Sequence, residues 1–356
     1  MEESDPPFVE FYKNLFDNQK TNDIGVFDDV EECEVPTIDL SQLHQGGREA
    51  ADCKREIAEA SQKWGFFQVI NHGVSLDVLE KMRCEQMKVF KKTFYDKANN
   101  HCNLNFPAGS YRWGTPSATC LRQLAWSEAF HIPLTDISNM GGLTSLSTTM
   151  DQFAMMVSNL AENLAEILAE QLGHKSNFFK ENCWPSTCYL RLNRYPPCPV
   201  PSQVFGLMPH TDSDFLTILH QDQIGGLQLV KDGKWIAVKP KKEALIINIG
   251  DLFQVLPRFC CYFLQTYIIQ VSLFSISVFF NLFQAWSNDV YKSVEHRVVA
   301  NKHRERFSVA YFFCPSYDTV IQSCVENSIY KKFSFREFRQ QVQDDVKRLG
   351  YKIGLP

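Results

Sequence analysis

The sequence contains no Cys-x-x-Cys pair, although 12 of its 356 residues are cysteine. Structural zinc sites commonly use such pairs, so the cysteine pattern predicts no zinc finger or zinc ribbon. The first residues, MEESDPPFVEFYKN, lack the basic start and apolar run of a secretory signal. We therefore expect a cytoplasmic location, with the nucleus as a second compartment, and reduced cysteine thiols.

A strongly basic region is also missing. Lys and Arg number 36 against 41 Asp and Glu, which gives a net charge of −5. Binding to a nucleic-acid backbone needs a basic surface, so no nucleic-acid partner is expected. What is present is a globular composition, with 44% hydrophobic and 22% charged residues. The length suits one large domain or two closely packed ones.

The first half of the chain reads as a helical region that contains two short strands. Residues 95–148 are rich in Gly, Pro, Ser and Thr and are predicted to be irregular. The predicted elements are a strand at Val35–Leu40, a helix at Ala51–Lys63, a strand at Trp64–Asn71, a helix capped by Ser75, and a long helix at Met150–Leu172 that stops at Gly173.

From about residue 188 the pattern changes to short β-branched and aromatic runs, which predict a sandwich or barrel. The predicted strands are Tyr189–Leu192, Phe215–His220, Leu227–Leu229, Trp235–Val238, Ala244–Ile249, Arg297–Val299 and Phe307–Phe313, and a charged helix follows at Phe335–Leu349. The architecture expected is a helical N-terminal part followed by an all-β core. We divide the chain into a lead-in (1–34), an N-terminal module (35–150), a supporting helix region (151–186), the core (187–320) and a helical C-terminal segment (321–356).

A His-x-Asp motif occurs twice, at His210-Thr211-Asp212 and at His220-Gln221-Asp222. Two histidines and one carboxylate on one face of a metal leave positions open for other ligands, an arrangement that suits non-haem iron(II). The first motif precedes an apolar strand, a natural rim for a site. The second is followed by Gly225-Gly226 and is interpreted as a turn. We therefore favour His210 and Asp212 as ligands.

The third ligand must be a later histidine, either His296 or His303. His303 lies in the polar stretch NKHRE, which is typical of a solvated hairpin loop. His296 directly precedes the apolar strand predicted at Arg297–Val299, so we choose His296 as the third metal ligand.

A basic residue follows His296 by ten positions. Arg306 and Ser308 are two residues apart on a predicted strand, so their side chains point to the same face. The planar guanidinium group of Arg can pair with both oxygens of a carboxylate. The two residues are therefore a candidate cradle for the far carboxylate of a dicarboxylate co-substrate.

Taken together, these motifs resemble those of the plant 2-oxoglutarate- and Fe(II)-dependent dioxygenases, over almost the whole chain. The segments that carry the resemblance are Val35–Leu40, WGFFQVINHGV (64–74), NRYPPC (193–198), PHTDSDFLTILHQDQIGGLQL (209–229), NIGD (248–251), and the set His296, Arg306 and Ser308. Within the family, SYRWGTP (110–116) and WSEAFHIP (126–133) resemble gibberellin 2-oxidases, especially those that act on C20 gibberellins.

The resemblance implies a double-stranded β-helix, or jelly roll, flanked by helices. It implies Fe(II), 2-oxoglutarate and O2 as cofactor and co-substrates, with ascorbate as an additional candidate. Asn193 and Tyr195 would help to hold 2-oxoglutarate beside Arg306 and Ser308, and Arg306 would serve catalysis with the three metal ligands. The substrate would be a gibberellin-like diterpenoid acid, inactivated by 2β-hydroxylation, and the protein would be a monomer.

Residues 255–284 (VLPRFCCYFLQTYIIQVSLFSISVFFNLFQ) do not fit this family pattern. After Arg258 there is no charged residue until Asp289, and the run is long enough to cross a bilayer. We favour a translated intron: its 30 codons keep the reading frame, a Val codon begins with GT, and a Gln codon can end in AG. Removing it gives the continuous run GDLFQAWSN. A genuine inserted loop and a membrane segment are the alternatives.

An exposed apolar run of this length favours aggregation, so we expect the chain as written to be impaired. Two further alternatives stay open at this stage. The same chemistry could act on a flavonoid or another specialised metabolite, or the chain could be a non-catalytic, misfolded or membrane-associated isoform.

Overall fold

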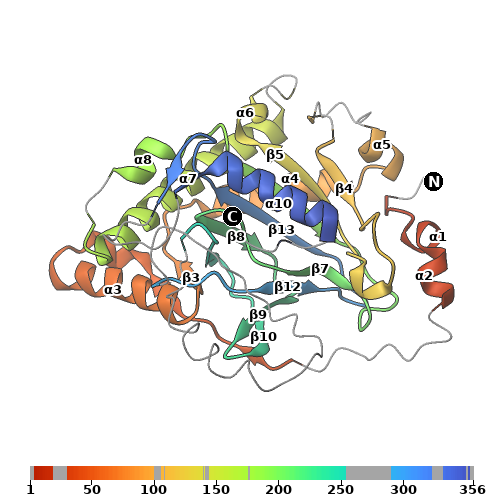
Figure 1. The fold of residues 1–356 in the computed structure, drawn as a ribbon, viewed down its shortest axis with the longest axis horizontal. Coiled ribbons are helices and arrows are strands. Elements are labelled where there is room, and N and C mark those ends of the chain that lie inside the picture. The colour runs from red at the N-terminus through yellow and green to blue at the C-terminus, as the bar shows by residue number, and fades with distance from the viewer. Residues whose placement is uncertain are drawn as a thin grey trace, which may run out of the picture.

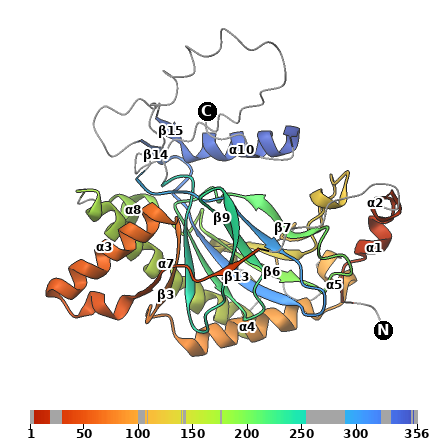
Figure 2. The same ribbon diagram turned by 90° about the horizontal axis from the view of Figure 1, so that it is seen from below.

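The structure is a computed structural model, and it describes residues 4–18, 30–99, 106–107, 109–138, 140, 144–174, 177–253, 290–322, 332–349 and 352. The segment 255–284, with the hypotheses about its origin, lies outside the described residues. The predicted domain boundaries remain predictions. Figures 1 and 2 show the described helices arranged around a central β core.

The core consists of two facing sheets, and the predicted jelly roll with flanking helices is confirmed. The smaller sheet has the order β1-β10-β9-β12-β7. Its strands are β1 (Glu32–Cys33), β7 (Phe205–His210), β9 (Leu227–Lys231), β10 (Lys234–Val238) and β12 (His296–Val299). Apolar residues of both sheets, among them Phe66, Ile246, Leu229 and Val298, meet in one buried cluster.

The larger sheet has eight strands in the order β2-β3-β11-β8-β13-β6-β5-β4. They are β2 (Thr37–Asp39), β3 (Phe66–Ile70), β4 (Tyr111–Trp113), β5 (Glu128–Pro133), β6 (Tyr189–Tyr195), β8 (Leu216–Gln221), β11 (Leu245–Ile249) and β13 (Arg306–Phe313). A separate pair comprises β14 (Val320–Ile321) and β15 (Phe333–Ser334).

The helices cover the larger sheet and the ends of the core. They are α1 (Phe8–Phe11), α2 (Lys13–Asn18), α3 (Gly47–Lys63), α4 (Leu76–Phe90), α5 (Phe94–Asn99), α6 (Leu134–Ile137), α7 (Ser145–Gln171), α8 (Phe178–Asn182) and α10 (Phe335–Leu349). None of these helices is long and apolar enough to span a bilayer.

Several sequence predictions about individual elements are wrong. The stretch 95–148 is not irregular throughout, because it supplies α5, α6, β4 and β5, and the two strands extend the larger sheet. The N-terminal part therefore contributes more strands to the core than expected. Strand β7 was not predicted at all. Ser75 occupies the N-cap position of α4, but its side chain makes no capping hydrogen bond.

The long helix α7 begins five residues before the predicted start. Thr144 and Ser147 form a reciprocal capping box, and this fixes the first turn at Ser145. At the other end Gly173 has a φ of 82°, the left-handed conformation that stops a helix, as predicted. The helix runs across the boundary proposed between residues 150 and 151.

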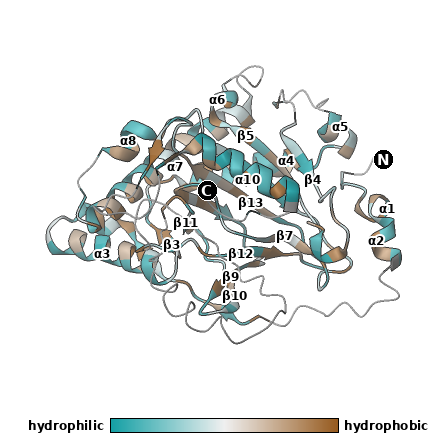
Figure 3. Cartoon of the chain, in the orientation of Figure 1, coloured by the Kyte–Doolittle hydropathy of each residue, from teal (hydrophilic) through white to brown (hydrophobic). Residues whose placement is uncertain are grey.

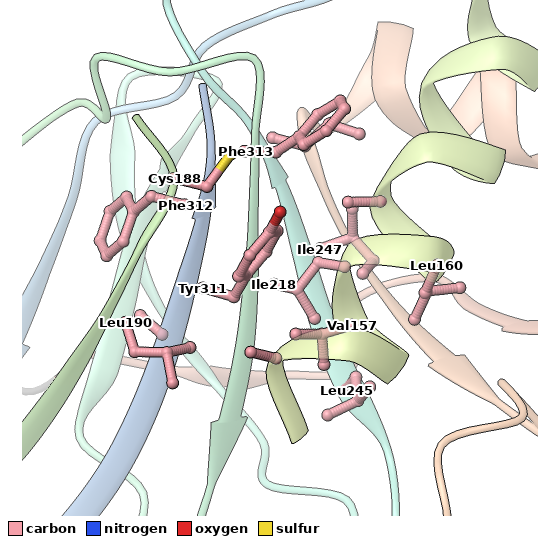
Figure 4. Close-up of a cluster of buried hydrophobic side chains, with 14 of the residues drawn as sticks. Val157, Leu160, Cys188, Leu190, Ile218, Leu245, Ile247, Tyr311, Phe312 and Phe313 are labelled. Atoms are coloured by element: carbon pink, nitrogen blue, oxygen red, sulfur yellow. The ribbon is translucent and has the colours of Figure 1, made fainter. Parts of the chain in front are cut away.

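Side chains of α7 pack against the outer face of the larger sheet. Figure 4 shows Val157 and Leu160 of α7 facing Ile218 of β8, Ile247 of β11 and Tyr311 of β13. Neighbouring strand residues alternate between the two faces of a sheet, so Phe312 points to the opposite side and lines an interior cavity. One face of the sheet is thus held by α7, and the other is free to form a site.

The C-terminal helix α10 lies on the side of the sheets opposite to α4 (Figure 2). Phe335 and Phe338 anchor it and are both fully buried. Its outer surface is hydrophilic, whereas the strands beneath are mostly hydrophobic (Figure 3). The helix matches the predicted charged helix at Phe335–Leu349, and it closes one end of the cavity.

Candidate metal centre and co-substrate site

The two predicted histidine ligands lie on neighbouring antiparallel strands. His210 is the last residue of β7, His296 is the first residue of β12, and the register pairs them directly. Their ring centroids are 4.3 Å apart. The ring of Phe66 from β3 packs edge-on against His296, with a centroid distance of 5.1 Å. Strand pairing therefore joins residues that are distant in sequence.

Asp212 lies in the turn between β7 and β8 and is held by two side chains. Thr217 Oγ1 and Asn248 Nδ2 both donate to its Oδ2 atom, at 2.6 and 2.8 Å. The Asp212 carbonyl oxygen accepts from the amide of Asp251 at 2.8 Å. Oδ1 is left facing Nε2 of His210, 3.5 Å away. The carboxylate is thus held with Oδ1 toward His210 and Oδ2 toward His296, whose Nε2 atom lies 3.8 Å from Oδ2.

Backbone carbonyls fix the orientation of both imidazole rings. Nδ1 of His210 donates to the carbonyl oxygen of Met208 at 2.7 Å, and Nδ1 of His296 donates to that of Val294 at 3.0 Å. In each ring Nε2 is left facing the carboxylate of Asp212. Such hydrogen bonds are typical of histidines that ligate metals.

The charges in this cluster also suit a cation. Burial and the neighbouring His210 lower the pKa of His296 to about 4, so His296 is neutral at physiological pH. Burial alone would raise the pKa of Asp212, but the two imidazoles and the Thr217 hydroxyl hold it below its ordinary value. The site therefore presents the neutral imidazole of His296 and the ionised carboxylate of Asp212 side by side.

The three ligating atoms of His210, Asp212 and His296 all lie within 4.8 Å of one another. The set contains no sulfur, and three donors on one side leave further coordination positions open. This donor chemistry fits non-haem iron(II) better than a closed structural zinc site. Among the described residues this is the only cluster of at least three such donors.

The alternative candidates lie elsewhere. His303 is an exposed loop residue outside the cluster. His220 and Gln221 belong to β8, so the second His-x-Asp motif is not wholly a turn, contrary to our interpretation. Its residues have structural contacts instead: Asp222 Oδ2 accepts from the amide of Phe307 at 2.6 Å, and Gln221 contacts Arg306.

Arg306 is the largest of the fully buried side chains in the described part of the protein, with 2% exposure. Its Nη2 donates to Oε1 of Gln221 at 2.7 Å, and its Nη1 donates to Oγ of Ser308 at 3.4 Å. Its Nε atom is buried without a hydrogen-bond partner among the described residues. A buried cation with an unused donor indicates that an anion belongs here. This observation fits a carboxylate of 2-oxoglutarate.

The two other predicted co-substrate residues lie opposite Arg306 and Ser308 on β6. The register pairs Asn193 with Ser308 and Tyr195 with Arg306. Asn193 Nδ2 donates to Oγ of Ser308 at 3.5 Å and lines the cavity. Tyr195 is not among the residues that line it, and the Cζ atom of Arg306 lies 4.9 Å from the centroid of its ring. Gln86 of α4 fixes the pair of strands from behind by donating to the carbonyl oxygens of Asn193 and Ser308.

One cavity of about 270 Å³ joins the metal cluster to Arg306 and Ser308. Several residues around Asp212 and the cavity were not predicted from the sequence. Asn248 and Thr217 orient Asp212, and their only sequence signal was their place in the two motifs 209–229 and 248–251. Lys352 Nζ donates to the carbonyl oxygen of Thr211 and to Oγ of Ser213, and so holds both neighbours of Asp212. No sequence signal marked Lys352, Arg191 or Arg339.

Two families of sequences match this chain. The 2OG-Fe(II) oxygenase superfamily matches residues 186–267 and 269–315. A family described as the N-terminal region of a non-haem dioxygenase in morphine synthesis matches residues 35–141. The chain is 57% identical over 363 residues to gibberellin 2-beta-dioxygenase 8 of Arabidopsis thaliana, covering 99% of this chain and 98% of the relative. It is 44% identical to gibberellin 2-beta-dioxygenase 6 of Oryza sativa subsp. japonica, covering 99% and 95%.

Solved structures share the fold. A crystal structure of JOX2 in complex with 2OG, Fe and JA is 28% identical, with a TM-score of 0.67, and covers 96% of this chain and 94% of that one. The binary complex of AtDAO1, a dioxygenase for auxin oxidation from Arabidopsis thaliana, with 2-oxoglutarate is 27% identical, with a TM-score of 0.62. It covers 83% of this chain and 97% of that one.

Proposed function

Because this chain belongs to the 2OG-Fe(II) oxygenase superfamily, we propose that it hydroxylates a gibberellin of the C20 type at C-2 and thereby inactivates the hormone. The chain is a 2-oxoglutarate-dependent dioxygenase, with Fe(II) as its metal and O2 as a co-substrate. The observation that carries the proposal is the His210, Asp212 and His296 cluster in a cavity that also contains a buried, incompletely paired arginine. The identity to a gibberellin 2-beta-dioxygenase over nearly the whole chain supports the substrate.

We assign the metal to Nε2 of His210, Nε2 of His296 and Oδ1 of Asp212. Bound iron(II) would supply the oxidative chemistry, in which decarboxylation of 2-oxoglutarate by O2 is coupled to hydroxylation of the substrate. The protein contributes the geometry. Its carbonyl oxygens hold each imidazole by Nδ1, and Thr217 and Asn248 hold the carboxylate by Oδ2, so the three donors are arranged before any ligand enters.

The 2-oxoglutarate anchor in this proposal is Arg306, assisted by Ser308 and Asn193. Arg306 is fixed by Gln221 and stacked on Tyr195, so little side-chain freedom is lost when it binds a carboxylate. Its burial excludes water from the ion pair and strengthens the pair. In this arrangement Tyr195 does not line the cavity, and its ring stacks on the guanidinium group of Arg306.

The substrate would occupy the rest of the cavity, where the walls become apolar and aromatic. Tyr189 and Phe312 stack there with ring centroids 4.4 Å apart, and Phe335 and Val342 of α10 form the roof. Such walls suit the hydrocarbon rings of a diterpenoid better than a polar metabolite. We also propose a monomer that acts in the cytoplasm, with the nucleus as a second compartment, and sedimentation and cell fractionation test these two points.

A substrate panel tests the proposed function. The chain is incubated with Fe(II), 2-oxoglutarate and O2 and with a C20 gibberellin, a C19 gibberellin or a flavonoid. We expect succinate release above the substrate-free level with the C20 gibberellin, together with a 2β-hydroxylated product identified by mass spectrometry. Turnover of the flavonoid in preference to both gibberellins would contradict the assignment while leaving the oxygenase class intact.

A further inference from the structure

Two arginine side chains line the cavity in addition to Arg306. Arg191 projects from β6 and Arg339 from α10, so one wall and the roof each supply a guanidinium group. Both residues are partly buried. Within the described part of the chain, neither forms an ion pair with a carboxylate. The observed contacts are uncharged: Arg191 Nε donates to Oδ1 of Asn193 at 2.8 Å, and Arg339 Cζ lies 5.8 Å from the ring centroid of Phe335.

Strand register separates Arg191 from Arg306. The β6–β13 ladder pairs Tyr195 with Arg306 at one end and Arg191 with Ala310 four residues further along. At about 3.3 Å per residue this places the backbones of Arg191 and Arg306 roughly 13 Å apart along the strand direction. Ala310, the register partner of Arg191, has a small side chain and also lines the cavity. The backbone of Arg191 is therefore well separated from that of Arg306, while its Nε atom reaches Asn193, one of the residues assigned to the 2-oxoglutarate anchor.

The side chains around Arg191 and Arg339 are largely aromatic or aliphatic, which suits a ligand that combines an acid group with a hydrocarbon body. Tyr189 and Phe312 pair two positions beyond Arg191 in the same ladder, on the same face of the sheet, and their rings stack on each other. Phe335 and Val342 belong to the same helix as Arg339 and also line the cavity. A ligand that fits here must have a broad hydrocarbon body and at least one negative charge.

The pKa of His131 is also affected by the charges of Arg191 and Arg339. The ring of His131 on β5 lies 4.1 Å from that of Tyr189. Burial, and after it the positive charges of Arg191 and Arg339, lower the pKa of His131 to about 4. Because His131 is neutral at physiological pH, it adds no third charge. The positive charge on this part of the described cavity lining therefore comes from the guanidinium groups of Arg191 and Arg339.

We propose that Arg191 and Arg339 bind a carboxylate of the substrate and make the free acid, rather than its ester, the preferred ligand. This inference rests on the proposed gibberellin function and deepens it, because it names the residues that recognise the acid group. Each of the two anions in the cavity then has its own arginine: Arg306 for 2-oxoglutarate, and the Arg191 and Arg339 pair for the diterpenoid acid. Held at that group, the substrate would present its rings toward the metal cluster.

The test compares an acid with its ester. Equilibrium binding to the full chain is measured by calorimetry with Fe(II) and 2-oxoglutarate present and oxygen excluded, so that no turnover occurs. The ligands are a C20 gibberellin and the same gibberellin with every carboxyl group methylated. The variants are Arg339→Gln and Arg339→Lys. The matched control is Arg336→Gln on the exposed face of the same helix, where Arg336 pairs with Asp318 at 2.9 Å.

We expect the unaltered chain to bind the acid roughly 10- to 100-fold more tightly than the ester, the scale of a charged hydrogen-bonded pair. Arg339→Gln should remove most of that preference, Arg339→Lys should restore part of it, and Arg336→Gln should keep it. Equal binding of acid and ester by the unaltered chain, or a preference that survives Arg339→Gln, would overturn the inference and leave the gibberellin function standing. Failure of both the unaltered chain and the form lacking residues 255–284 to bind either ligand would instead overturn the gibberellin function itself, and this inference with it.

Discussion

Nε2 of His296 lies 3.8 Å from Oδ2 of Asp212, although 84 residues (296 − 212) separate them in the sequence. The contact exists because β12 pairs with β7 and places His296 directly opposite His210. Residues 254–289, which lie outside the described structure, fall between the two strands. On either side of that gap, Ser293 Oγ donates to Oδ1 of Asp251 at 2.8 Å. The candidate metal centre therefore depends on strand pairing rather than on a local motif alone.

Asp212→Asn should weaken iron binding by more than about 100-fold, since even outer-shell partners of a metal site typically contribute 10- to 100-fold. The amide keeps the shape of the carboxylate but lacks its charge, and it is a poor ligand. The measurement is iron(II) stoichiometry and affinity under anaerobic conditions. Asp222→Asn makes the same change in the second His-x-Asp motif and should leave iron binding unaltered. Equal losses in the two variants would argue against the chosen ligand set.

Arg306→Lys should raise the Kd for 2-oxoglutarate by roughly 10- to 100-fold, because lysine keeps the charge but loses the bidentate geometry. The change also leaves Gln221 without its partner. Equilibrium binding of 2-oxoglutarate to the iron-loaded protein measures the effect. Arg304→Lys, an exposed change two residues away, is the control and should bind 2-oxoglutarate normally. An unchanged Kd in Arg306→Lys would show that the anchor lies elsewhere.

Glu128→Gln should lower the free energy of unfolding by about 3 kcal/mol, the scale on which removing one partner of a buried ion pair destabilises a protein. Glu128 is fully buried between Lys97 Nζ at 2.6 Å and Arg194 Nη1 at 2.8 Å. The variant removes the carboxylate that Lys97 pairs with in the described structure, whereas Arg194 keeps its ion pairs with Asp5 and Glu305. Denaturant unfolding measures the change, and Glu59→Gln, in an exposed pair with Lys63, should have little effect. A stability loss equal to that of Glu59→Gln would contradict this account of the network.

The site residues could be predicted from sequence because their identity and order are local. The His210-x-Asp212 motif shortly precedes one predicted strand, His296 directly precedes another, and Arg306 and Ser308 share one face of a strand. The structure places the three metal candidates in one cluster. Gln221 shows the limit of this reasoning: it holds Arg306 across the β8–β13 pairing, and only the register of that pairing reveals the contact.

Strand β7 was missed for a different reason. Its sequence, FGLMPH, contains a glycine and a proline, which usually argue against a strand. Among the described strands it lies at the edge of its sheet beside β12, and an edge strand tolerates a proline that donates no hydrogen bond. Arg191 and Arg339 were not predicted because a strand and a C-terminal helix meet at the cavity only in the folded protein.

Deleting residues 255–284 should increase the yield of soluble protein and the rate of turnover. The deletion removes 30 residues without Asp, Glu or Lys and shortens the separation of Asp212 and His296 to 54 residues (84 − 30). Exposed apolar runs favour aggregation, and a displacement of about 1 Å at a reacting centre can cost on the order of 100-fold in rate. Succinate release per mole of soluble protein compares the two chains. Equal solubility and equal rates would mean that the segment is a tolerated insertion.

The most direct test of the central claim follows the oxygen atoms. The chain, and the form lacking residues 255–284, are supplied with Fe(II), 2-oxoglutarate and a C20 gibberellin under isotopically labelled O2, and both products are analysed by mass spectrometry. The account predicts one labelled oxygen in succinate and one in a 2β-hydroxylated gibberellin, formed in equal amounts and absent in Asp212→Asn. Succinate without any hydroxylated gibberellin, or a product formed equally well by Asp212→Asn, would contradict it.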